Sequence, residues 1–505
     1  MWYDESFTAY QSQGSLSEIV DVARWDSNPP LYLIIMHYWL KLAGLSEFTL
    51  RFPSLIFNSL ACSILFLFAY RSFNIKVALL ATLFFLSSDS MFYYAQEARA
   101  YSFLFLLTIL SGFLFFELIR KPGWLISSAL AITNAALFYT HYIETVIVVF
   151  QFVLIIYIGR KTIVKYYALS FGLFIAMMIP WISRAGELFG QGGNHILKIP
   201  VISDVYWAFI QLNGDSRLVS ACYFVLIVWS IIAFIYHLPE QVKEEKAIII
   251  YLLLWVIGSF AVIYLLSFKA PMFAKRYLLF SLPGIYLLCA YGITLLKKPA
   301  YIFITTSLVF ILSLTTLNYQ VKRDTDYKSA IPAVQSTLTD QSLVVLQSID
   351  MSMLFAFYFD KTLFSYRDLI EELAYKGVVT VNDSTWLTNY DFSFYKKVIV
   401  VQTYENFCDP DGTLLKLMNQ KFNLRNQNKD FAGVTISYYD NLHASNVIAD
   451  FNTVEKQRQL LKLNSVKEKI YRDGAWLSKI TMKAEANNTP VDSMVTMDAK
   501  WVLEN

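Results

Sequence analysis

Charged residues are scarce in this sequence. Lys, Arg, Asp and Glu together make up 16% of the 505 residues, whereas hydrophobic residues make up 56%. Because a soluble globular domain of ordinary composition carries about 25% charged residues, this composition predicts an integral membrane protein. The net charge of +3 is small for a chain of this length, and we expect no nucleic-acid partner.

Cysteine pairs and a signal peptide are also lacking. The first residues, "MWYDESFTAY", are polar and aromatic and do not have the basic start and apolar stretch of a signal peptide. This is an unusual beginning for a chain with many spans, and we expect that a spanning helix should precede it and is missing from the sequence. The cysteines show neither disulfide nor metal-binding spacing; they are Cys62, Cys222, Cys289 and Cys408.

Long apolar runs fill residues 51–319. A membrane-spanning helix needs about 20 mostly apolar residues, and on this criterion the sequence predicts about ten spans. Several connections are short and basic, including Arg71 with Lys76 and Arg120 with Lys121. By the positive-inside rule these connections face the cytoplasm. The predicted spans are residues 51–70, 77–94, 100–119, 124–140, 143–159, 163–182, 218–238, 247–268, 277–296 and 300–317.

The ends of the chain have a different composition. Residues 1–50 are predicted to form a first extracytoplasmic loop whose helices, "SLSEIVDVARW" and "PPLYLIIMHYWLKLAG", lie in the membrane interface. Residues 320–440 alternate strand patterns ("SLVVLQ", "KKVIVVQTY", "FAGVTISYY") with helix patterns ("DLIEELAYKG", "GTLLKLMNQKF"). Residues 441–505 are predicted to be a charged helical tail. The expected fold is therefore an α-helical polytopic membrane protein with a C-terminal soluble α/β domain.

Polar clusters gather in the connections predicted to lie outside the cell. An even number of spans places residues 1–50 and the C-terminal domain on that same side. Ionisable residues at membrane depth are costly and indicate function, although charges at helix ends can also simply reach the interface. The clusters are "WYDES", "WDSNPPLY", "YYAQEARAYS", "YTHYIE" and "APMFAKRYLLF".

These clusters hold the parts needed for group transfer from a lipid phosphate. Asp4 or Glu5 can act as a general base towards a substrate hydroxyl. Arg99, Lys275 and Arg276 can bind a phosphate, because Arg offers a planar fork of donors and Lys a compact charge. These residues could also have purely structural roles. Glu97 could pair with Arg99 to join two helix ends, a contact that contributes about 0–1 kcal/mol when exposed. The other charged side chains could simply lie in the membrane interface.

The ordered motifs resemble the membrane glycosyltransferases of the GT-C superfamily. "DE", "NPPLYLIIMHYWLKLAGLSEFTLRFPSL", "YYAQEARAYSF", "YTHYIE" and "KRYLLFSLPG" occur in this order over residues 1–320. They look most like the bacterial family 39-like branch, which is similar to the protein O-mannosyltransferases and the lipid A aminoarabinose transferases. The C-terminal domain matches in position only.

The resemblance implies transfer of a sugar from a polyprenyl-phosphate donor to a protein, lipid or glycan acceptor, usually with inversion. It implies that Asp4 is the catalytic residue and that Glu5 supports it. It also implies that Glu97 and Arg99 line the same cavity. The "KRY" segment, with Lys275, Arg276 and Tyr277, would then face the donor phosphate. Some relatives use a divalent metal cation held partly by histidine. Here His141 is a weak candidate ligand, and Asn28 stands where many relatives have histidine, which weakens a metal site in that loop.

Two other functions are compatible with parts of the sequence. A transporter or flippase of a lipid-linked or small solute would show broken helices and polar residues near mid-membrane, whereas the apolar runs here are mostly uninterrupted. A membrane-anchored scaffold would make the outer clusters incidental. We therefore expect a multi-pass enzyme of the cytoplasmic membrane, with its active site and C-terminal domain on the extracytoplasmic side.

Overall fold

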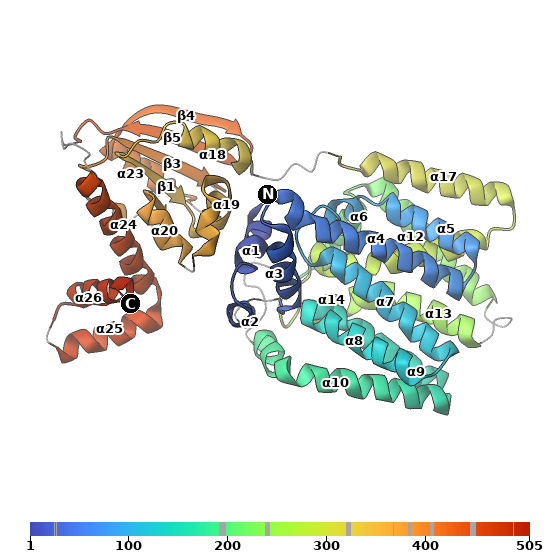
Figure 1. Ribbon diagram of the computed structural model, residues 1–505. Helices are drawn as coiled ribbons and strands as arrows, with labels where there is room; N and C mark the ends of the chain where they lie inside the picture. Colours follow the sequence, from blue (N-terminus) through green and yellow to red (C-terminus); the bar gives the residue numbers. More distant parts are fainter. Residues whose placement is uncertain are drawn as a thin grey trace. The chain divides into compact units, whose positions relative to one another are not determined.

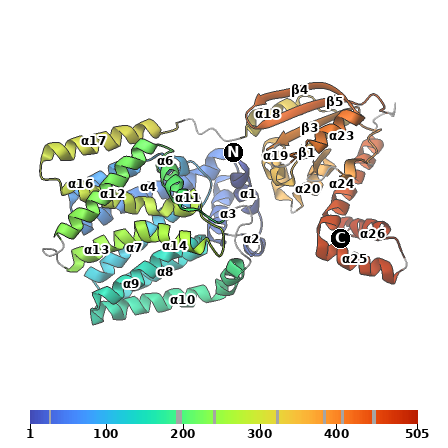
Figure 2. The same ribbon diagram turned by 180° about the vertical axis from the view of Figure 1, so that it is seen from behind.

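The computed structural model divides the chain into two compact units. One unit comprises Met1–Gly14 with Lys322–Asn505, and the other comprises Ser15–Val321. Figures 1 and 2 show the elements of each unit from two sides. The structure describes residues 1–505 except 25, 27, 191–197, 238–242, 320–324, 367, 382–384, 389, 405–408, 445–450, 488 and 505.

The unit of Ser15–Val321 is helical and contains the membrane-spanning segments. Its helices are α2 (Leu16–Ala23), α3 (Leu31–Ala43), α4 (Glu47–Ser72), α5 (Ile75–Leu86), α6 (Asp89–Tyr94), α7 (Tyr101–Arg120), α8 (Trp124–Thr140), α9 (Val146–Ile158), α10 (Lys161–Gly190), α11 (Ile202–Leu212), α12 (Arg217–His237), α13 (Lys243–Leu253), α14 (Ser259–Leu266), α15 (Lys275–Leu278), α16 (Leu282–Thr294) and α17 (Pro299–Thr316).

Seven helical segments among the described residues are long and apolar enough to cross a membrane. They are Glu47–Ser72, Tyr101–Arg120, Lys161–Ser183, Arg217–Tyr236, Glu245–Leu266, Lys275–Thr294 and Pro299–Thr316. The predicted spans 77–94, 124–140 and 143–159 coincide with shorter apolar helices. The chain is thus a multi-pass membrane protein, and the number of ten spans stays a prediction.

The predicted span 77–94 consists of two helices. The hydroxyl of Ser88 accepts a hydrogen bond from the backbone N–H of Met91 at 3.3 Å and so caps the start of α6. A serine at this position satisfies one of the donors that a helix N-terminus leaves free, which favours a new helix over a continuous one. Because of this break, α6 begins at Asp89.

The spans differ in how much of their surface is inside the protein. In the segments containing α7 and α16, 78% and 89% of the most apolar window is buried within the protein, whereas in α17 the value is 11%. Gly112 of α7 permits this close packing, because a Cβ there would lie 3.1 Å from the Tyr251 hydroxyl and 3.3 Å from the ring of Phe68. Thus α7 and α16 form the centre of the bundle, and α17 exposes its apolar side chains to lipid.

A mixed five-stranded sheet forms the centre of the other unit. Its strands are β1 (Ser342–Gln347), β2 (Val378–Val381), β3 (Lys397–Thr403), β4 (Asn423–Phe431) and β5 (Val434–Asp440), in the order β2-β1-β3-β5-β4. Strands β2 and β3 pair with β1 in parallel, and β5 pairs antiparallel with β3 and β4. The helices are α18 (Tyr327–Gln335), α19 (Ser352–Phe359), α20 (Leu369–Tyr375), α21 (Thr385–Thr388) and α23 (Thr413–Lys421). An α/β domain after the spans is therefore confirmed.

Residues 451–504 form three helices rather than a single tail. They are α24 (Phe451–Arg472), α25 (Gly474–Ala486) and α26 (Val491–Glu504). Their contacts bury a small apolar cluster that includes Val466, Ile480 and Val495. Helix α24 also packs on α20, where Lys469 pairs with Asp368 at 2.7 Å.

The first helix, α1 (Tyr3–Gln11), belongs to the unit with the sheet. It packs against α19, which follows β1. The sequence grouped residues 1–50 into one loop, whereas the structure groups only Met1–Gly14 with the α/β domain. Helices α2 and α3 of the predicted loop belong to the membrane unit.

Candidate active site

The two acidic residues of "WYDES" have different surroundings on α1. Asp4 and Glu5 both lie in the first turn of the helix, which begins after Trp2. Glu5 is fully buried, and its Oε2 accepts a hydrogen bond from the backbone N–H of Trp2 at 3.3 Å. Asp4 is only half-buried. A carboxylate in the first turn is stabilised by the positive end of the helix dipole, and Glu5 helps to close that turn, while Asp4 is the more accessible of the pair.

The "QEAR" segment is the connection between α6 and α7 in the membrane unit. Glu97 is 1% exposed, and its backbone carbonyl accepts hydrogen bonds from the Ser54 hydroxyl at 2.6 Å and from the Arg99 N–H at 2.8 Å. The Ser102 hydroxyl donates to the carbonyl of Tyr94 at 2.8 Å. These bonds join the segment to α4 and to the start of α7, so that the backbone at Glu97 is held in place.

The "KRY" segment is the short helix α15, and it meets "YTHYIE". The guanidinium carbon of Arg276 lies 5.2 Å from the ring centroid of Tyr277, a cation–π distance. The Tyr277 ring also lies 5.6 Å from the ring of His141, whose Nδ1 is 2.5 Å from Oε2 of Glu144. Tyr277 therefore lies close to both Arg276 and His141, two residues that belong to different clusters in the sequence.

The membrane unit also brings "QEAR" and "KRY" together. Lys275 interacts electrostatically with Glu97, and Arg276 interacts with Tyr94. Arg99 is half-buried beside Glu97, and Asn28 is half-buried immediately before Pro29 at the start of α3. The predicted site residues outside α1 thus all lie in the membrane unit, and two of its motifs converge.

The sequence interpretation missed two further carboxylates at this convergence. Lys275 interacts with Asp89 and Asp215 as well as with Glu97. Asp89 begins α6 and accepts a hydrogen bond from the N–H of Asn318 at 3.1 Å, while Asp215 has a left-handed backbone with φ of 56° between α11 and α12. A charged residue inside a predicted span is itself a signal of function, so Asp89 within 77–94 could have been found.

Asp4 and Glu5 belong to the α/β unit, and Glu97, Arg99, Lys275 and Arg276 belong to the membrane unit. Their assembly into one pocket stays a prediction.

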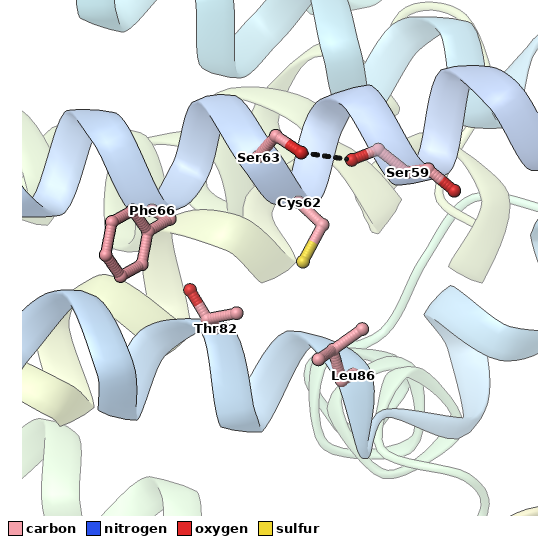
Figure 3. Close-up of a pocket in the computed structure, with 6 residues that line it drawn as sticks. All are labelled: Ser59, Cys62, Ser63, Phe66, Thr82 and Leu86. Atoms are coloured by element: carbon pink, nitrogen blue, oxygen red, sulfur yellow. Dashed lines mark hydrogen bonds between the residues drawn. The ribbon is translucent and has the colours of Figure 1, made fainter.

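A separate cavity lies between α4 and α5 (Figure 3). Its volume is about 420 Å³, and small polar side chains such as Ser59, Cys62 and Thr82 line it. The Ser63 hydroxyl donates to the Ser59 carbonyl at 2.9 Å, so this polar group is satisfied within its own helix. None of the predicted site residues lines this cavity.

The described residues do not fit a metal centre. Within the described ranges, no three His, Cys, Asp or Glu side chains are grouped so that they could hold a metal ion. His141, the candidate ligand, is instead paired with Glu144 and packed against Tyr277. We therefore derive no step that passes through a metal.

Known proteins share this architecture and part of this sequence. Residues 27–183 match the family model described as dolichyl-phosphate-mannose-protein mannosyltransferase. The fold is similar to ArnT from Cupriavidus metallidurans in the apo state, with a TM-score of 0.57, 12% identity, and coverage of 88% of this chain and 94% of that chain. It is also similar to ArnT bound to undecaprenyl phosphate, with a TM-score of 0.53, 12% identity, and coverage of 88% and 95%. No curated protein matches the sequence.

The fold is thus that of a polytopic membrane protein with an α/β domain after its spans, and it is similar to the fold of ArnT. The family match over residues 27–183 and this fold both agree with a likeness to the membrane glycosyltransferases. The resemblance stated from the sequence is confirmed.

Proposed function

We propose that the chain transfers a sugar from a polyprenyl-phosphate donor to a hydroxyl-bearing or amine-bearing acceptor at the outer face of the cytoplasmic membrane. The observation that carries the proposal is the interaction of Lys275 with Glu97 and of Arg276 with Tyr94 in a membrane unit of this fold. Basic side chains at the end of a spanning segment suit a phosphate whose tail lies in the bilayer. The acceptor is a protein, a lipid or an envelope glycan.

In the proposed reaction Asp4 removes the proton of the acceptor. The acceptor atom attacks the anomeric carbon, the bond between that carbon and the phosphate oxygen breaks, and its electron pair leaves with the polyprenyl phosphate. Attack on the face opposite the phosphate inverts the anomeric configuration. Arg99, Lys275 and Arg276 stabilise the charge that develops on the phosphate, which is the kind of interaction that most lowers such barriers.

The remaining residues support these groups. Glu5 closes the first turn of α1, the turn that carries Asp4. Tyr277 lies against Arg276 and His141, and in the proposal it holds the guanidinium towards the phosphate. In the proposal, Glu97 and Asn28 line the active site.

The donor site can be tested with undecaprenyl phosphate as the probe. In purified full-length protein, Arg276→Gln should weaken its binding about 10–150-fold, because a hydrogen bond to a charged group contributes about 1.5–3 kcal/mol and each 1.4 kcal/mol is about tenfold. Lys298→Gln is a matched control, because Lys298 lies 5.5 Å from the ring centroid of Tyr301 but on a connection predicted to be cytoplasmic. Equal losses for the two variants would reject the donor site.

The catalytic assignment needs a second variant. Asp4→Asn should reduce sugar transfer to a small residual rate and leave the binding of undecaprenyl phosphate unchanged. Mass spectrometry of envelope glycans and glycoproteins from cells without the gene would identify the acceptor and the sugar. Transfer by Asp4→Asn at the normal rate would reject Asp4 as the base.

A further inference from the structure

The helix that carries Asp4 is attached to the α/β domain. Helix α1 packs on α19, and the two belong to the same compact unit. They are about 350 residues apart in the sequence, so that this contact is made only in the folded protein. The domain that follows the membrane spans therefore holds the segment in which the proposed base lies.

Tyr10 is the main contact at the end of α1. Its hydroxyl donates to the backbone carbonyl of Tyr366 at 3.0 Å, and its ring meets the ring of Phe364 edge-on with centroids 5.4 Å apart. Phe364 is nearly fully buried and packs on Phe357 of α19 at 6.0 Å. One side chain thus joins α1 to the segment that follows α19.

The segment that Tyr10 contacts is stabilised by its own hydrogen bonds. Residues Lys361–Ser365 form a short 3₁₀ helix, and Asp360 is its N-cap residue. The carboxylate of Asp360 accepts hydrogen bonds from the Thr362 hydroxyl at 2.6 Å and from Lys376 Nζ at 3.2 Å. Phe364 and the carbonyl of Tyr366 are consequently presented from a fixed turn rather than from a free loop.

We infer that Tyr10, held by Phe364 and the carbonyl of Tyr366, is a positioning residue that fixes Asp4 for proton abstraction. The inference rests on the proposed function of Asp4. The two residues are six positions apart on one helix, about 9 Å along its axis at 1.5 Å per residue. A displacement of about 1 Å at a reacting group can cost on the order of 100-fold in rate, so a loose α1 slows transfer even though every reacting group is present.

The first test compares Tyr10 variants in the full-length enzyme. Tyr10→Ala should lower kcat about 10–100-fold and leave the KM for the lipid-phosphate donor unchanged. Tyr10→Phe keeps the ring contact and should retain activity within about tenfold of the parent. Tyr366→Ala is the matched control, because it removes a tyrosine but keeps the backbone carbonyl that Tyr10 uses, and it should leave kcat unchanged.

The second test asks whether Tyr10 acts through Asp4. Single-turnover transfer is measured for Tyr10→Ala, Asp4→Asn and the double variant, with thermal unfolding as a check that each protein is folded. If Tyr10 positions Asp4, adding Tyr10→Ala to Asp4→Asn causes no further loss. A full additional loss in the double variant, or a normal kcat in Tyr10→Ala, overturns the inference while Asp4 remains the base. Normal transfer by Asp4→Asn rejects the proposed function, and the inference falls with it.

Discussion

Three buried polar side chains form a closed hydrogen-bond ring between α7, α8 and α9. The Ser111 hydroxyl donates to Asn134 Oδ1 at 2.6 Å, Asn134 Nδ2 donates to Gln151 Oε1 at 3.2 Å, and Gln151 Nε2 donates to the Ser111 Oγ at 2.7 Å. All three side chains are buried. Because α7 begins directly after the "QEAR" segment, the ring fixes the helix from which that segment projects.

We predict that Gln151→Leu lowers the free energy of unfolding by about 1–3 kcal/mol. The change keeps the volume of the side chain but removes two of the three bonds, and interhelical hydrogen bonds in membranes contribute about 0.6 kcal/mol on average and about 1.7 at most. The buried Nδ2 of Asn134 is left without its acceptor, which adds to the cost. Reversible unfolding in mixed micelles, followed by tryptophan fluorescence, measures the difference.

The matched control is Thr133→Val. Thr133 precedes Asn134 on α8, is also buried, and donates only to the carbonyl of Ala129 in its own helix at 2.8 Å. This near-isosteric change should cost less than about 0.5 kcal/mol.

Replacing all three ring members by apolar residues should restore much of the stability lost in Gln151→Leu, because no buried polar group then lacks a partner. A triple variant whose loss equals the sum of the three single losses would refute the reasoning, since independent residues add.

Two predictions concern the α/β unit. Lys469→Met should lower the stability of this unit by about 1–3 kcal/mol, because the buried carboxylate of Glu371 loses the cation 3.2 Å away. Differential scanning calorimetry measures the loss. The double variant Lys469→Met with Glu371→Gln should recover part of it. Hydrogen bonds from Thr362, and then the contact with Lys376, lower the pKa of Asp360 below its usual value. This contribution to stability is complete above the unfolded pKa near 3.9 and is lost as the pH falls through the lower folded value. Asp360→Asn should reduce the acid sensitivity measured between pH 5 and 2, and an unchanged pH profile would contradict the assignment.

Composition and periodicity could predict the elements whose signals are local. The spans of α7 and α12 follow from apolar runs of about 20 residues, and β1 and β3 follow from continuous apolar runs that are buried on both faces. Strand β4, "NLRNQNKDF", could not be recognised, because it lies at the edge of the sheet, where polar side chains are tolerated. The four residues of β2 give too short a pattern.

The candidate site residues could be proposed from their residue types, whereas their arrangement in space could not. Basic residues of "KRY" and the buried Glu97 were found because charge next to apolar runs is conspicuous. The partnership of Lys275 with Asp215 could not be predicted, because no local pattern connects a turn after α11 with α15. The contact between α1 and α19 could not be predicted either, because it joins residues separated by most of the chain.

The two units carry different halves of the proposed chemistry. Asp4 and its support by Tyr10 lie in the α/β unit, whereas Lys275 and Arg276 lie in the membrane unit. In the proposed sugar transfer the base acts on the acceptor and the cations act on the donor phosphate, so in the proposal each unit serves a different substrate. It follows that changes at Tyr10 should alter kcat without altering donor binding, while changes at Arg276 should alter donor binding first. Kinetics that separate along this division would be expected of the proposed enzyme, whereas a transporter or a scaffold gives no reason for it.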